Sequence, residues 1–274
     1  MFNVKSKFYD IITKKLLLYL SGVNKMKSNL WKVVPIEAGS IVLDRSAMTH
    51  FKGKGEQIQV PIWCAAATDG IHKILIDTGI RDIKEYRKSE PGATQSPSQE
   101  ITKALKEIMN WEPDDVDVVI NTHLHCDHCG GNSKFKNAAF YVQSREWHEA
   151  FHPIIPEAPF YDKASFDKNA VNYFMWNFID GDAHILPGVD VITTPGHTAG
   201  HQSVLLNTKD GVLCVSGDIC NIAENINENL EPNIVVMVSE TYESFDKIRQ
   251  FAHLILPGHD PDIKNGISEF IKIK

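Results

Sequence analysis

The chain has 274 residues, of which 43% are hydrophobic and 23% charged, so it is long enough to bury a substantial core in one large domain or two small ones. A net charge of −7 argues against nucleic acid as a partner. Five cysteines at irregular spacing do not form the pattern of a disulfide-stabilised secreted protein, and with no export signal we expect a cytoplasmic location.

The first 28 residues differ in charge from the rest of the chain. Six lysines against one acid, Asp10, give residues 1–28 a charge of +5, which leaves −12 for the remainder. Their apolar run, residues 16–20, is too short to cross a bilayer and short for a signal peptide. Three interpretations are open: a basic amphipathic helix, a weakly ordered extension, or a start of translation at Met26. We favour the last two, and expect a basic extension over 1–28, one domain over 29–274 and no stable membrane association.

Short apolar runs rich in Val, Ile and Leu predict strands along the whole of residues 29–274. They occupy residues 31–36, 40–44, 58–68, 73–79, 116–123, 138–143, 189–197, 203–208, 211–218 and 253–259. Helical periodicity predicts one helix within 96–112, with Ser98 as its N-cap, and another within 241–254. Because the strands come in blocks as well as alternating with helices, we expect an α/β (α+β) domain of two sheets packed face to face, with helices outside.

Two stretches lack a clean period. Residues 89–97, SEPGATQSP, are predicted to form a loop. Residues 151–180 are dense in aromatic side chains and proline. These aromatics either form a satellite core under a long loop or build an apolar wall beside the active site, and the sequence favours neither interpretation.

Four predicted strands end in a side chain that can bind a metal ion. These side chains are His123, His197, Asp218 and His259. Functional sites gather at the carboxyl ends of strands in α/β folds, because loops there can vary on a rigid scaffold. Four such endings, far apart in the sequence, therefore predict one site assembled by the fold.

The stretch NTHLHCDHCGGN, residues 121–132, holds further ligand candidates. It could form a closed Cys/His structural site or an open His/Asp catalytic site. In an extended segment His123 and His125 share a face and can chelate one ion, while a turn at Gly130-Gly131 lets Asp127 and His128 point toward a second. The nitrogen and oxygen candidates are His123, His125, Asp127, His128, His197, Asp218 and His259. One zinc ion takes fewer protein ligands than this, so the set predicts two ions that share a carboxylate, the arrangement that recurs in hydrolysis.

The order His123-Leu-His125-Cys-Asp127-His128 resembles the H-x-H-x-D-H signature of the metallo-β-lactamase-fold hydrolases. Residues 31–262, including "VPIWCAAAT", "ILIDTG" and the final "PGHD", are similar to the quorum-quenching N-acyl homoserine lactonases of that superfamily. The resemblance implies a four-layer αβ/βα sandwich with two Zn²⁺ per chain, other divalent metals being possible. It implies that His123, His125 and His197 hold one zinc, that Asp127, His128 and His259 hold the other, that Asp218 bridges them, and that Asp77 supports the ligands from behind.

The same resemblance implies a zinc-dependent hydrolase of carboxylic esters, a lactonase. A metal-bound hydroxide would open the ring of an N-acyl homoserine lactone, with Asp127 as the catalytic group that carries a proton to the leaving oxygen. The expected partner is this small-molecule lactone, and the expected assembly is a monomer or a homodimer. Asn221 replaces a tyrosine that contacts substrate in the lactonases, and Cys126 replaces an aromatic residue. Asn221 is therefore the candidate substrate contact, and a same-fold hydrolase of another lactone, a thioester or a cyclic amide is the alternative.

Several other classes share parts of this pattern. Glyoxalase II-type thioesterases carry the signature, but the lactonase-like N-terminal segments argue against them. Di-iron electron-transfer relatives place an acid at the position of His125, and β-lactamases typically lack the bridging set. Cys126 and Cys129 form a CxxC, which we interpret as two small buried apolar residues and not as a redox pair. His201 is expected to be structural, and Phe51 and Trp63 are candidates for either the pocket or the core.

Overall fold

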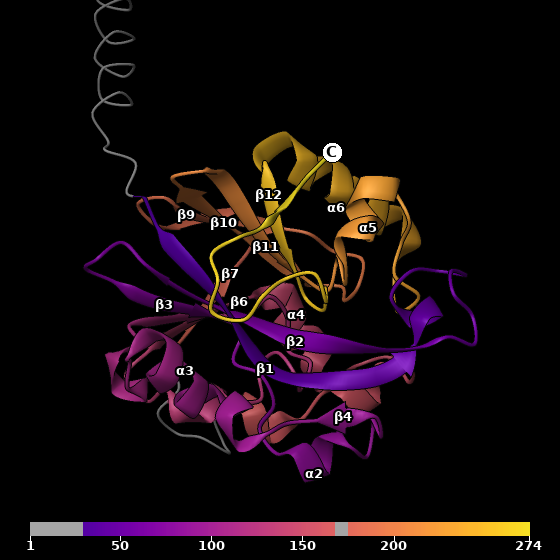
Figure 1. Ribbon diagram of the computed structural model, residues 1–274, viewed down its shortest axis with the longest axis horizontal. Coiled ribbons are helices and arrows are strands. Elements are labelled where there is room, and N and C mark those ends of the chain that lie inside the picture. The colour runs from indigo at the N-terminus through magenta and orange to yellow at the C-terminus, as the bar shows by residue number, and fades with distance from the viewer. Residues whose placement is uncertain (1–29, 168–174) are drawn as a thin grey trace, which may run out of the picture.

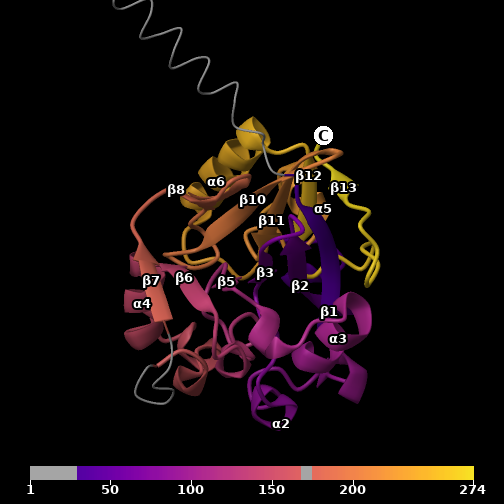
Figure 2. The ribbon, with the colours of Figure 1, turned by 90° about the vertical axis from the view of Figure 1, so that its left-hand side faces the viewer.

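Two β-sheets pack face to face, with helices on both outer surfaces, in the computed structural model of the chain (Figure 1, Figure 2). The structure describes residues 30–167 and 175–274. The order of layers is helices, sheet, sheet, helices, which confirms the expected αβ/βα sandwich. The predicted N-terminal extension, residues 1–28, lies outside the described residues. No helix in the described part of the chain is long and apolar enough to cross a bilayer.

The first sheet has seven strands in the order β4-β1-β2-β3-β5-β6-β7. Strands β4, β1, β2 and β3 pair antiparallel, whereas β3, β5, β6 and β7 pair parallel. Their bounds are Lys32–Asp44 for β1, Gln57–Thr68 for β2, Lys73–Ile76 for β3, Ala93–Thr94 for β4, Val118–Ile120 for β5, Ala139–Gln143 for β6 and Met175–Ile179 for β7.

The second sheet has six strands in the order β13-β12-β11-β10-β9-β8. All its pairs are antiparallel except β11 with β12. The bounds are Ala183–Leu186 for β8, Val189–Thr193 for β9, Gln202–Thr208 for β10, Gly211–Gly217 for β11, Leu254–Pro257 for β12 and Ile271–Lys272 for β13.

The helices divide between the two sheets (Figure 2). Among the helices of the described residues, α2 (Ile83–Tyr86), α3 (Ile101–Met109) and α4 (Ser144–Phe151) lie on the side of the first sheet. Helices α5 (Ala223–Glu228) and α6 (Val238–Phe251) lie on the side of the second. The predicted helix within 241–254 corresponds to α6, which begins three residues earlier and ends at Phe251.

Both faces of the central strands are buried, and side chains alternate between two cores. Ile74 and Ile76 of β3 pack between the sheets, whereas Leu75 packs toward α3. In β11, Leu213 and Val215 likewise lie between the sheets. This period of two on a strand that is covered from both sides explains the nearly continuous apolar runs of the sequence.

Some sequence expectations were wrong in detail. The runs 31–36 and 40–44 are one strand, β1, whose register shifts between Glu37 and Ser40. Ser98 is not the N-cap of α3. It lies inside a 3₁₀ turn, Pro97–Gln99, and the side chain of Glu100 caps α3 by accepting from the Thr102 amide. The loop 89–97 contains the short strand β4.

The aromatic segment 151–180 serves both purposes that the sequence left open. Phe151, at the end of α4, packs with Tyr161, Phe166 and a residue of β6 in a small cluster separate from the main cores. Phe160 instead faces a candidate metal ligand, since its ring centroid lies 5.3 Å from that of His125. The segment also supplies β7, which escaped prediction because this edge strand exposes Met175 and Phe178. Residues 168–174 lie outside the described residues.

Candidate metal centre

The loop that follows β5 carries four of the seven candidate ligands. It leaves the sheet after Ile120 and makes a tight turn in which the carbonyl of His125 accepts from the amides of His128 and Cys129. The chain then passes close under the end of β3. A Cβ at Gly131 would lie 2.4 Å from the Thr78 carbonyl oxygen, so only glycine allows this approach. The turn therefore holds His123 and His125 on one side and Asp127 and His128 on the other.

The other three candidates arrive from the second sheet. His197 follows β9, Asp218 follows β11 and His259 follows β12. The approach of β11 and β12 is close, because a Cβ at Gly258 would lie 2.1 Å from Asp218 Oδ1. All seven predicted side chains meet at this edge of the sandwich. Ligand atoms within 4.8 Å of one another form two buried groups with no shared member, His123/His125/His197 (the first group) and Asp127/His128/His259 (the second group), and a further group, His123/His128/Asp218, that links them.

In the first group three imidazoles face one another. His125 Nδ1 and His197 Nε2 are 3.1 Å apart, and the rings of His123 and His197 are in edge contact at 4.9 Å. The outer nitrogens of two rings have protein partners. His197 Nδ1 donates to the Ile234 carbonyl at 2.9 Å, and His125 Nε2 lies 3.3 Å from Glu157 Oε2. The inner nitrogens of both rings are therefore left to face the group.

In the second group Asp127 lies beside two imidazoles. Asp127 Oδ2 is 3.7 Å from His128 Nε2 and 3.9 Å from His259 Nε2. The outer nitrogen of His259, Nδ1, donates to the Pro61 carbonyl at 2.8 Å. As in the first group, a fixed outer nitrogen directs the inner nitrogen toward its neighbours.

Asp218 reaches both groups. Its Oδ1 is 3.2 Å from His128 Nε2, and its Oδ2 is 3.1 Å from His259 Nε2 and 3.7 Å from His197 Nε2. Burial opposes ionisation of Asp218, but the charges of His259 and His128 outweigh it and hold the pKa of this carboxyl well below its usual range. Asp218 is thus placed where a shared carboxylate would be needed.

Asp77 lies behind the ligands, at the end of β3. Its backbone is left-handed, with φ 59°, a conformation that is uncommon for residues other than glycine, although Asp adopts it more readily than most. Its Oδ2 accepts from His128 Nδ1 at 2.9 Å and from the Thr122 hydroxyl at 2.7 Å, and its Oδ1 accepts from the Thr122 amide at 2.8 Å. Thr122 Oγ1 in turn lies 3.0 Å from His123 Nδ1. One carboxylate therefore orients two candidate ligands.

The donor atoms that face the centre fit metal ions. Among the described residues, His123 Nε2, His128 Nε2 and Asp218 Oδ1 are buried and form no hydrogen bond, because the last two, although 3.2 Å apart, are not aligned to make one; such atoms are rare and unfavourable in a folded protein. Burial and the neighbouring imidazoles lower the pKa of His123 well below its usual value, which favours the neutral ring that a metal ligand needs, whereas Asp218 and Asp127 raise the pKa of His128 and of His259 in spite of burial. Imidazole nitrogens and carboxylate oxygens in this number suit two divalent ions of the zinc type.

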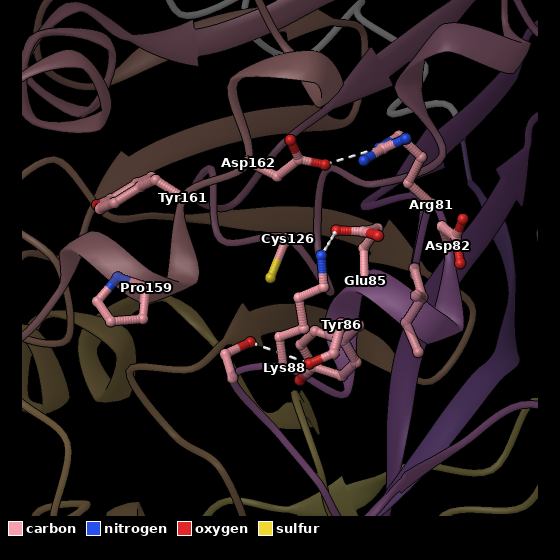
Figure 3. Close-up of a pocket in the computed structure, with 11 residues that line it drawn as sticks. Arg81, Asp82, Glu85, Tyr86, Lys88, Cys126, Pro159, Tyr161 and Asp162 are labelled. Carbon is pink, nitrogen blue, oxygen red and sulfur yellow. Dashed lines mark hydrogen bonds and ion pairs between the residues drawn. The ribbon is translucent and has the colours of Figure 1, made fainter.

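Two cavities adjoin the centre. A small one, of about 50 Å³, is lined by Asp127, Asp218 and His259 together with Asn221, so the predicted substrate contact does lie at the site. The remaining residues that line it are Ile41, Leu43, Met48, Tyr86, Glu90, His125, Phe160, His197 and Ile234. A larger one, of about 330 Å³, lies between α2 and residues 159–162, with Cys126 on its wall (Figure 3).

The remaining sequence candidates lie away from the centre or play a supporting part. Trp63 belongs to the core, where its indole donates to the Asp260 carbonyl, and Phe51 is 81% exposed. His201 is buried, with Nδ1 bonded to Thr194, as expected of a structural histidine. All five cysteines are free thiols. Cys129 is buried, as expected, whereas Cys126 is only partly buried and lines a cavity; burial raises the pKa of both thiols.

Sequence reasoning missed several polar residues at the site. Glu157 contacts His125, and the Tyr86 hydroxyl donates to Asp127. Glu146 accepts from the Leu124 amide and from Thr198, beside the first group. Tyr86 and Glu157 lie in segments without periodicity, and nothing local in the sequence signals their contacts.

Comparisons with known proteins agree with this geometry. Residues 60–272 match the model of the Metallo-beta-lactamase superfamily. An N-acyl homoserine lactonase of Bacillus sp is 30% identical over 255 residues, which cover 87% of this chain and 97% of that protein. The N-acyl homoserine lactonase AiiA of Bacillus thuringiensis subsp. kurstaki is 28% identical over 84% of this chain and 93% of that protein.

A solved structure is also similar over almost its whole length. It is an N-acyl homoserine lactone hydrolase with the product N-hexanoyl-L-homoserine bound at its catalytic metal centre. The TM-score is 0.74 at 26% sequence identity, and the match covers 88% of this chain and 98% of that one.

Proposed function

The chain belongs to the metallo-beta-lactamase superfamily and, within it, to the N-acyl homoserine lactonase family, and from this premise we propose that it opens the ring of N-acyl homoserine lactones. It is a metal-dependent hydrolase that breaks a lactone ester bond. Water adds to the carbonyl carbon, the bond from that carbon to the ring oxygen breaks, and the product is an open-chain N-acyl homoserine. Such a product would no longer serve as a quorum-sensing lactone.

We assign the candidate ligands to two zinc ions. His123, His125 and His197 would hold one ion and Asp127, His128 and His259 the other, with Asp218 shared between them. When bound, the ions would lower the pKa of a water molecule and polarise the lactone carbonyl. The support is the arrangement of the imidazoles: the outer nitrogens of His125, His128, His197 and His259 face protein oxygens, and their inner nitrogens converge on a common space.

Three residues of the chain position the ligands and the substrate in this space. Asp77 fixes the orientation of His128 through the 2.9 Å hydrogen bond to Nδ1. Asp127 lines the small cavity and has an oxygen facing His128 and His259, so it can carry a proton from the attacking water to the departing ring oxygen. Asn221 lines the same cavity and can donate a hydrogen bond to a substrate oxygen, although its amide cannot act as an acid.

Hydrolysis of a lactone panel tests the proposal. Zinc-loaded protein is incubated with N-hexanoyl and longer-chain homoserine lactones, and ring opening is followed by mass spectrometry as the gain of one water. Ring opening that is lost on chelation and restored by zinc supports the proposal. Intact lactones after prolonged incubation with fully zinc-loaded protein would refute it.

A second candidate function is hydrolysis of a different lactone, a thioester or a cyclic amide by the same centre. The observation that favours it is the larger cavity, in which Cys126 lines one wall. The charged side chains of Arg81, Asp82, Glu85 and Lys88 also line this cavity. A bulky aromatic residue at position 126 would fill part of this space. Simple γ-lactones, thioesters and cyclic amides in the same panel distinguish the two functions.

We further propose a cytoplasmic location and a single catalytic domain over residues 29–274. Five free thiols suit a reducing compartment. Monomer and homodimer are both compatible with the sequence, and light scattering of the purified protein distinguishes them.

A further inference from the structure

Tyr86 places a hydroxyl group at the candidate metal centre. It is the last residue of the short helix α2, and only 5% of its surface is exposed. Its hydroxyl donates to Asp127 Oδ2 at 3.0 Å. Tyr86 lines both cavities, and Figure 3 shows it in the wall of the larger one.

The oxygen that accepts this hydrogen bond is the carboxylate oxygen of Asp127 that faces the two imidazoles of the second group. Asp127 Oδ2 is also the oxygen nearest to His128 Nε2 and His259 Nε2, at 3.7 and 3.9 Å. A hydroxyl bound to that atom restricts rotation of the carboxylate and keeps Oδ2 turned toward the two imidazoles. No other residue that lines the small cavity has a hydroxyl group, and the buried Oδ1 of Asn221 has no partner among the described residues.

The helix that carries Tyr86 is itself fixed in place. The Asp82 side chain caps α2 by accepting from the Lys84 amide at 2.8 Å, and the Tyr86 carbonyl accepts from the Ser89 hydroxyl at 3.0 Å. Before the helix, Arg81 pairs with Asp162 at 2.7 Å across the larger cavity (Figure 3). The hydroxyl therefore has a defined position relative to Asp127.

We propose that Tyr86 is a positioning residue for Asp127 and sets the affinity of the Asp127/His128/His259 group for its metal ion. The inference rests on the proposed dinuclear centre, but not on the identity of the substrate. Partners that orient a ligand typically contribute about 10- to 100-fold to metal affinity. The effect should be confined to one of the two metal equivalents, because Tyr86 forms no hydrogen bond with the His123/His125/His197 group.

Zinc competition with a chromophoric chelator tests the proposal without any lactone. In Tyr86→Phe, one zinc equivalent should bind about 10- to 100-fold more weakly and the other unchanged. The matched control is Tyr242→Phe, which loses a hydroxyl whose hydrogen bond goes to Glu231 and not to a candidate ligand, and which should bind both equivalents as the wild type does. With Co²⁺ in place of zinc, the visible absorption bands should change in Tyr86→Phe alone.

Two further measurements separate positioning from a general structural role. In the Asp127→Ala background, which leaves no side-chain oxygen to accept from the Tyr86 hydroxyl, Tyr86→Phe should change zinc affinity by less than about twofold, because the two side chains act through one interaction. The melting temperature of the metal-free variant reports folding separately. Wild-type affinity for both equivalents in Tyr86→Phe, or an equal loss in the Asp127→Ala background, would overturn the proposal. If no lactone is hydrolysed but zinc affinity behaves as expected, the proposed substrate is wrong and the role of Tyr86 stands.

Discussion

Two clusters of charged and polar side chains in this molecule serve different purposes. The Glu224 cluster (Arg45, Thr49, Lys52 and Glu224) lies near the surface at the start of α5, and the Glu224 carboxylate accepts from Arg45 at 2.5 Å, Thr49 at 2.7 Å and Lys52 at 2.8 Å. In the metal centre, buried ring nitrogens and a carboxylate oxygen lack hydrogen-bond partners. The difference shows what distinguishes a site from a structural ion-pair cluster: atoms that are buried, oriented from behind and left unsatisfied.

The largest effect is expected at Asp218, which reaches both groups of the centre. Asp218→Asn removes the shared carboxylate charge, and lactone hydrolysis should fall by more than about 100-fold, beyond the loss typical of a residue that only orients a ligand. Glu224→Gln, in the cluster, should leave turnover within about twofold, because no candidate ligand contacts Glu224 and distant sites act independently. Steady-state kinetics of both variants with the same lactone check this difference. Equal losses of turnover in the two variants would contradict it.

A smaller effect is expected at Asp77, which supports the ligands without being one. Asp77→Asn removes the charge that faces His128 Nδ1 and should lower metal affinity or turnover by about 10- to 100-fold. Metal titration followed by kinetics at saturating zinc separates the two. Turnover that recovers fully at high zinc would assign Asp77 to metal affinity alone, whereas wild-type behaviour at low zinc would contradict the support inferred from its hydrogen bonds.

Metal removal should lower the melting temperature, because zinc bound at the centre stabilises the fold, and the Glu224 cluster should not contribute to this shift. A free zinc concentration 100 times the dissociation constant adds about 2.7 kcal/mol per site, which raises the melting temperature of a domain of this size by roughly 5–10 °C. Glu224→Gln should show the same zinc-induced shift as the wild type. Differential scanning calorimetry with and without chelator measures this shift. A melting temperature that is the same with and without zinc would argue against a buried site.

The smallest effect belongs to the Glu224 cluster and depends on pH. Burial opposes ionisation of Glu224, but hydrogen bonds from Lys52, Arg45 and Thr49 lower the pKa of Glu224 to about 2. Because this pKa lies below the ordinary value of about 4.3, the ionised carboxylate stabilises the fold above pH 4.3, and the contribution is lost as the pH falls toward 2. Urea unfolding of metal-free protein should show Glu224→Gln destabilised by about 1–2 kcal/mol at pH 7, with the difference shrinking at pH 3. A difference in the free energy of unfolding that does not change with pH would show that ionisation of Glu224 is not its cause.

The layered fold and the ligand set could be predicted from the sequence because both follow local rules. Apolar runs revealed the buried strands, and His123, His197, Asp218 and His259 stood directly after such runs. The structure brings these four side chains together with the remaining predicted ligands. The resemblance to a known family added Asp77, whose hydrogen bonds to Thr122 and His128 now give it a physical role.

The contacts that complete the centre could not be predicted, because they depend on tertiary packing. Tyr86 lies on a helix of four residues, too short to show a period. Glu157 lies in a proline-rich segment that places Phe160 against His125. The predicted N-cap of α3 was wrong for a local reason. Ser96, Ser98 and Glu100 all have side chains that can cap a helix, and both serines belong to the 3₁₀ turn that precedes α3.

The metal content of the purified protein tests the account most directly. Protein saturated with zinc and passed through a desalting column is measured by inductively coupled plasma mass spectrometry against its concentration. We expect two zinc equivalents per chain in the wild type and fewer in Asp218→Asn. A wild-type protein that retains one equivalent or none, under conditions where its fold is intact, would contradict the convergence of seven side chains on a pair of ions.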